Sequence, residues 1–88
     1  MLFLAEFYLP GGADLAEIAD RARAGAEQAT RAGATVSFVE AIFVAQDENC
    51  FAVYCAHSAE EVTVAAALAG LVLDRVTPAI RARSVRRS

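Results

Sequence analysis

The sequence predicts one α+β domain with four strands and two helices in the order β-α-β-β-α-β. Two observations lead to this prediction. Four segments are rich in β-branched and aromatic residues, and two segments carry apolar residues at spacings of three and four. Glycines, prolines and polar clusters separate these segments, as expected for turns. A chain of 88 residues has room for only one such domain.

The first strand is expected over residues 2–9, which are mainly aromatic and aliphatic and end at a Pro-Gly-Gly turn. Asp14 is a suitable N-cap for the first helix, and Glu17 three residues later completes a capping-box pattern. The helical spacing continues to Ala32. Gly33 then suits the position just after a helix end, so the helix should stop there.

The second and third strands are expected over residues 35–45 and 50–56. Residues 46–49 are polar and suit the turn of a hairpin between them. The two segments should therefore pair in an antiparallel manner.

The second helix should begin at Ser58, which forms a capping box with Glu61, and continue through Ala69. Residues 73–80 then form the last strand. Because Pro78 lies inside this strand and cannot donate a hydrogen bond, the strand is expected at an edge of the sheet.

This order of elements is that of the ferredoxin-like fold, a four-stranded antiparallel sheet with two helices on one face. No element remains to cover the other face. Hydrophobic residues make up 57% of the chain, and a domain this small has proportionally much surface to keep polar. We therefore expect a homodimer, in which a second copy covers the apolar excess.

Alternate residues of a strand point to opposite faces of the sheet, and the alternate residues that are all apolar should face the helices. The other residues of each strand should lie on the helix-free face. These residues include four polar side chains among aliphatic and aromatic neighbours. The polar ones are Glu6, Tyr8, Glu40 and Tyr54, and the apolar ones are Leu2, Leu4, Val36, Phe38 and Ile42. Such a face indicates a dimer interface, a pocket for a small apolar ligand, or both.

Charge and composition exclude other partners. The net charge is −3, which argues against nucleic acid as a main partner. No segment is typical of a signal peptide or of a transmembrane helix, so a cytoplasmic protein with reduced cysteines is expected. Arginines gather at the end of the chain, and we divide it into a domain over residues 1–80 and a basic tail over residues 81–88.

Several short motifs along the chain fall in a familiar order and spacing. They are Glu6 with Leu9-Pro10-Gly11, Phe38-Val39-Glu40, Val53-Tyr54 with Ala56, and Ala69-Gly70 with Asp74-Arg75-Val76. From residue 2 to residue 80 the chain resembles a family of small bacterial proteins, largely of unknown function, that includes a nickel-binding protein. The resemblance implies a ferredoxin-like fold and a dimeric α+β barrel, in which two sheets pack face to face.

The chain departs from this family at three places. Ala65 stands where members commonly carry a His in the second helix, and Cys55 stands where a carboxylate is often found. Leu71-Val72 replaces the usual Pro after Gly70. The first departure removes an imidazole, which is a favoured nickel ligand.

A metal site, with nickel as the implied ion, would use His57 and Glu6. The other possible donors are Cys50, Cys55 and Glu40. No CxxC, HxH or HExxH spacing is present, so no local motif assembles these donors.

Acid–base chemistry is the alternative use of the same face. Glu6 and Glu40 would act as acid and base, because burial among apolar side chains raises a carboxyl pKa toward neutrality. Tyr8 and Tyr54 would orient the substrate by hydrogen bonds. A cyclase, an isomerase or a cofactor-free oxygenase fits this arrangement by analogy of fold.

Three hypotheses about function follow. The leading one is a small dimeric binding protein that holds a metal ion or a small apolar ligand at the helix-free face. The second is the small-molecule enzyme described above. The third is a structural partner module without a ligand.

Overall fold

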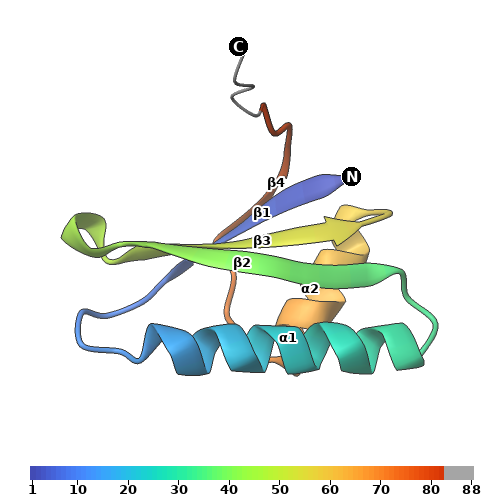
Figure 1. The fold of residues 1–88 in the computed structure, drawn as a ribbon, viewed down its shortest axis with the longest axis horizontal. Helices are drawn as coiled ribbons and strands as arrows, with labels where there is room; N and C mark the ends of the chain where they lie inside the picture. Colours follow the sequence, from blue (N-terminus) through green and yellow to red (C-terminus); the bar gives the residue numbers. More distant parts are fainter. Residues whose placement is uncertain (83–88) are drawn as a thin grey trace, which may run out of the picture.

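The computed structural model describes residues 1–82, and its elements follow the predicted order. They are β1 (Leu2–Tyr8), α1 (Leu15–Arg31), β2 (Val36–Val44), the 3-10 turn η1 (Ala45–Asp47), β3 (Asn49–Ala56), α2 (Ala59–Leu68) and β4 (Arg75–Ala79). The strands form one antiparallel sheet in the order β2-β3-β1-β4. Both helices lie against one face of this sheet (Figure 1). The predicted ferredoxin-like fold is confirmed.

Both predicted helix caps are present. Asp14 accepts hydrogen bonds from two backbone N–H groups in the first turn of α1, and Ser58 accepts one from Glu61 N–H at 3.3 Å. The Glu61 carboxylate in turn accepts from the backbone N–H groups of Thr35 and His57, at 2.9 and 3.0 Å. These bonds tie the start of α2 to the loop that enters β2, and they hold the pKa of Glu61 below its ordinary value.

The turn between β2 and β3 is a 3-10 turn followed by Glu48 in the left-handed conformation, with φ of 49°. The Glu48 carboxylate accepts a hydrogen bond from Gly11 N–H at 2.7 Å, and its backbone oxygen accepts from Leu9 N–H at 3.0 Å. The hairpin end is thereby joined to the loop that follows β1, which fixes that end of the sheet.

The core lies between the sheet and the two helices. Small residues let α1 and α2 approach closely, and Gly25 lies at the contact. A Cβ atom at this glycine would stand 2.5 Å from the backbone oxygen of Ala65 and 3.0 Å from the Cβ of Ala69. The contact thus requires a residue without a side chain at this position of α1.

The chain leaves the sheet at an edge. Among residues 1–82, β4 pairs only with β1, and Pro78 lies within it, as predicted for an edge strand. Residues 83–88 of the predicted basic tail lie outside the described residues. No helix within residues 1–82 is long and apolar enough to span a membrane.

Candidate ligand site on the helix-free face

The sheet face opposite the helices is formed by alternate residues of all four strands. Cross-strand pairing places fifteen side chains on it, which we call the helix-free face. They are Leu2, Leu4, Glu6, Tyr8, Ser37, Glu40, Ile42, Val44, Asn49, Phe51, Val53, Cys55, Arg75, Thr77 and Ala79. Seven of them are aliphatic or aromatic hydrocarbons, and Ile42 is 50% exposed. Within residues 1–82 no helix covers this face.

A β-bulge decides which residues of β2 reach this face. Phe38 pairs with Tyr54, whereas Glu40, two residues later, pairs with Val53, so the register shifts at Val39. The extra residue reverses the alternation, because residues before and after a bulge point to opposite faces. The expectation that Val36 and Phe38 lie on the helix-free face is therefore wrong, since they contact the core beneath the sheet.

Tyr54 is also on the other side of the sheet from its expected position. It is 0% exposed, belongs to the core between sheet and helices, and packs edge-on against Phe38 with ring centroids 5.7 Å apart. Burial raises the pKa of its phenol to about 12. Its polar hydroxyl suggested the open face, but most of the side chain is an apolar ring that the core can accommodate.

Glu6 lies on the helix-free face, as expected, and is held by two partners. Asn49 Nδ2 donates to its Oε2 at 2.6 Å, and Arg75 Nη2 lies 3.0 Å from its Oε1. These two hydrogen bonds lower the pKa of the carboxyl. The expectation that burial raises this pKa is wrong, because the bonds to the ionised form outweigh the desolvation of this carboxyl.

Glu40 shares the face with Glu6, and β3 runs between the two carboxylates. Arg81, just after β4, brings its Nη2 atom to 3.8 Å from Glu40 Oε2. Both side chains are about half exposed, so this ion pair is open to solvent. Each carboxylate on the face therefore has its own arginine.

Tyr8 lies at the end of β1, at the rim of the face, where it is 60% exposed. Its hydroxyl lies 3.5 Å from Glu48 Oε1. Of the four side chains that were candidates for catalysis, Glu6, Tyr8 and Glu40 share one face and Tyr54 is sealed beneath it.

A hollow of about 200 Å³ lies over the middle of this face. Its lining is aliphatic except for one ion pair and consists of Leu2, Leu4, Ile42, Val53, Ala79, Ile80, Glu40 and Arg81. Since Arg81 follows β4 and Glu40 lies on β2, the pair joins the two outer strands across the central ones.

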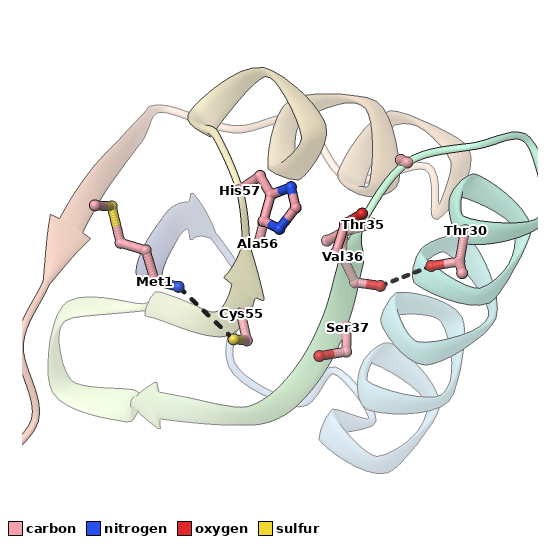
Figure 2. A pocket seen from close by; sticks show the side chains of 9 residues that line it. Met1, Thr30, Thr35, Val36, Ser37, Cys55, Ala56 and His57 are labelled. Carbon is pink, nitrogen blue, oxygen red and sulfur yellow. Dashed lines mark hydrogen bonds between the residues drawn. The ribbon is translucent and has the colours of Figure 1, made fainter.

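A second hollow, of about 400 Å³, lies at the end of β3 beside the loop that enters β2 (Figure 2). Cys55 and His57 are among its lining residues. In Figure 2 the thiol is turned toward Met1, whose backbone nitrogen lies 3.9 Å from it, and the imidazole lies on the side of Val36. This hollow holds two side chains of a kind that nickel favours.

The proposed metal donors do not lie close together within a single copy of the chain. Glu6 lies opposite Phe51 in the middle of β3, whereas His57 follows the end of that strand. Cys50 faces the core, and burial raises the pKa of its thiol. Among residues 1–82 no three His, Cys, Asp or Glu side chains come together in a group that could hold a metal ion.

Three side chains that complete the face were not expected from the sequence. Arg75 and Asn49 hold Glu6, and Arg81 reaches Glu40. Pairing of the first and last strands, which the ferredoxin-like order already implies, would have brought Arg75 near Glu6. The contact of Arg81 had no such signal, because this residue was assigned to a tail.

Comparison with known proteins gives one match. Residues 3–78 match the family described as nickel responsive protein SCO4226-like. The chain belongs to this family. The matched residues run from β1 into β4 and so reach every helix and strand of residues 1–82. The match confirms the resemblance drawn from the sequence motifs. No curated protein and no solved structure shows significant similarity to the chain.

Proposed function

We propose that this protein is a small homodimeric binding protein that holds its ligand on the helix-free face. The observation that carries the proposal is the face itself, an apolar surface with a hollow at its middle and its carboxylates paired at the sides. Apolar patches rimmed by polar groups are typical of interaction and ligand sites on small proteins.

The expected cover of this face is a second copy of the chain. A chain of 88 residues with 57% hydrophobic residues has more apolar surface than one small core can bury. Packing two such faces against each other would bury Ile42 and Val44, which are 50% and 37% exposed. A two-fold axis uses the same patch on both copies, so no additional surface is needed.

The family name raises nickel as the ligand, and the residues of one chain do not fit this ion. A nickel site needs several nitrogen, sulfur or oxygen donors that are free to bind. Glu6 and Glu61 are occupied by hydrogen bonds, and Cys55 and His57 line one hollow without a third donor of this kind in the described part of the chain. Binding of nickel would therefore need donors from two copies of the chain. The aliphatic lining of the central hollow instead suits a small apolar ligand held by a single copy.

Native mass spectrometry before and after addition of nickel tests the proposal. We expect twice the 9.3 kDa chain mass, together with a bound small molecule or a fixed number of nickel ions per dimer. The matched variants are Cys55→Ser and His57→Asn for nickel. Uptake that both variants leave unchanged would exclude the Cys55 and His57 donors. A monomer that retains neither ion nor small molecule would contradict the proposed function.

The enzyme hypothesis has less support from the geometry. The phenol of Tyr54 lies on the core side of the sheet, where a substrate on the helix-free face would not reach it. Glu6 is stabilised in its ionised form, which is the opposite of what a general acid near neutrality needs. The proposal is therefore limited to binding.

A further inference from the structure

The central hollow of the helix-free face has a size and a lining that define the class of its ligand. We infer that it takes a small, uncharged, mostly hydrocarbon molecule about the size of a substituted benzene ring. This inference rests on the proposed function, because it names the ligand of the same face.

The volume sets the size of the ligand. The hollow measures about 200 Å³. In another protein, an engineered apolar cavity of about 150 Å³ binds benzene. The present hollow therefore has room for a six-membered ring with two or three additional heavy atoms.

The lining sets the polarity of the ligand. Leu4 and Val53 lie opposite each other on the central strands and form the floor, while Ile42 lines the side of β2 and Ala79 the side of β4. All four side chains are hydrocarbons. A ligand that buries hydrocarbon against them is stabilised because apolar surface on both sides is removed from water.

The ion pair at the rim sets the charge. Glu40 and Arg81 are 3.8 Å apart and neutralise each other, so the lining has no unpaired charge to bind an ionic ligand. A carboxylate or an ammonium group in the hollow would gain little there, because each rim charge already has its partner and the rest of the lining is hydrocarbon. One hydroxyl or carbonyl group could still share a hydrogen bond with the rim.

The test is an NMR titration of ¹⁵N-labelled full-length protein with 4-ethylphenol. The same titration with benzoate and benzylamine tests an anion and a cation that are no larger than the phenol. We expect saturable shifts of the amides of Leu4, Val53 and Ala79 with the phenol, and at least tenfold weaker binding of both ions. Equal binding of an ion, or shifts confined to other residues, would overturn the inference.

A filled hollow gives the second readout. Ala79→Leu places a larger side chain in the hollow and should weaken binding of 4-ethylphenol at least tenfold. Ala67→Leu, on the exposed side of α2, is the matched control and should leave binding unchanged. Unchanged affinity in Ala79→Leu, when its amide spectrum shows a folded protein, would overturn the inference.

Failure of the inference and failure of the proposed function give different results. A dimer that does not bind 4-ethylphenol would refute the ligand class and leave the proposed homodimer standing. A monomer that binds neither the phenol nor nickel would refute both.

Discussion

At the scale of single residues, Tyr54 shows how a buried polar atom can be tolerated. Its hydroxyl is buried and has no hydrogen-bond partner among the described residues, while its ring packs against Phe38. A buried hydroxyl without a partner costs about 1–3 kcal/mol, and burial of the ring offsets this cost. The residue therefore stabilises the core through its ring and not through its hydroxyl.

This account predicts the effect of Tyr54→Phe. Removing the hydroxyl while keeping the ring should leave the free energy of unfolding unchanged or raise it by about 1 kcal/mol. Urea denaturation followed by circular dichroism measures the change. Tyr8→Phe, at the exposed rim, is the control and should change stability by less than about 0.5 kcal/mol. A loss of more than about 1 kcal/mol in Tyr54→Phe would show that its hydroxyl has a partner.

The same residue shows where reasoning from the sequence reached its limit. Tyr54 was expected on the helix-free face, and it lies on the core side of the sheet. Its hydroxyl is polar, but most of the side chain is an apolar ring, and Cys50 and Ala52 on the same side of β3 are buried in the core as well. Glu6 was assigned to the correct face, and only its hydrogen-bond partners were missing.

At the scale of elements, the contact between α1 and α2 depends on Gly25. A methyl group there would meet the backbone oxygen of Ala65 at 2.5 Å, a distance that side-chain rotation cannot relieve. In an exposed helix, replacing Gly by Ala stabilises by about 1 kcal/mol. At this position the steric effect should win, because one helix has to move away from the other.

Gly25→Ala should therefore lower the free energy of unfolding by about 1–3 kcal/mol. Thermal and urea denaturation measure it. The control is Ala24→Gly at an exposed position of the same helix, which should cost about 0.5–1 kcal/mol through helix propensity alone. If Gly25→Ala stabilises the protein, the close approach of the helices is absent in solution.

The elements themselves could be predicted from local patterns, and their register could not. Caps at Asp14 and Ser58, the hairpin and the edge position of the last strand all depend on nearby residues, and all are confirmed. The bulge at Val39 depends on how β2 pairs with β3 across the sheet. No local signal marks it, so the residues before it were placed on the wrong face.

At the scale of the whole molecule, the helices form one layer and the sheet a second, and a second copy of the chain is expected to cover the open side of the sheet. The helices cover one face of the sheet, and the helix-free face is open within residues 1–82 (Figure 1). A ferredoxin-like order predicts such a face from sequence alone, whereas the hollow on it depends on the contact of Arg81 with Glu40. The dimer remains a prediction.

The most direct test of the central claim is sedimentation velocity of the wild-type chain and of two variants. Ile42→Glu places a charge on the helix-free face, on the outer strand β2, and Val64→Glu places one on the exposed side of α2, where exposure is a similar 51%. We predict a dimer for the wild type and for Val64→Glu, and a monomer for Ile42→Glu at the same concentration. A wild-type monomer, or a dimer that Ile42→Glu leaves intact, would contradict the account.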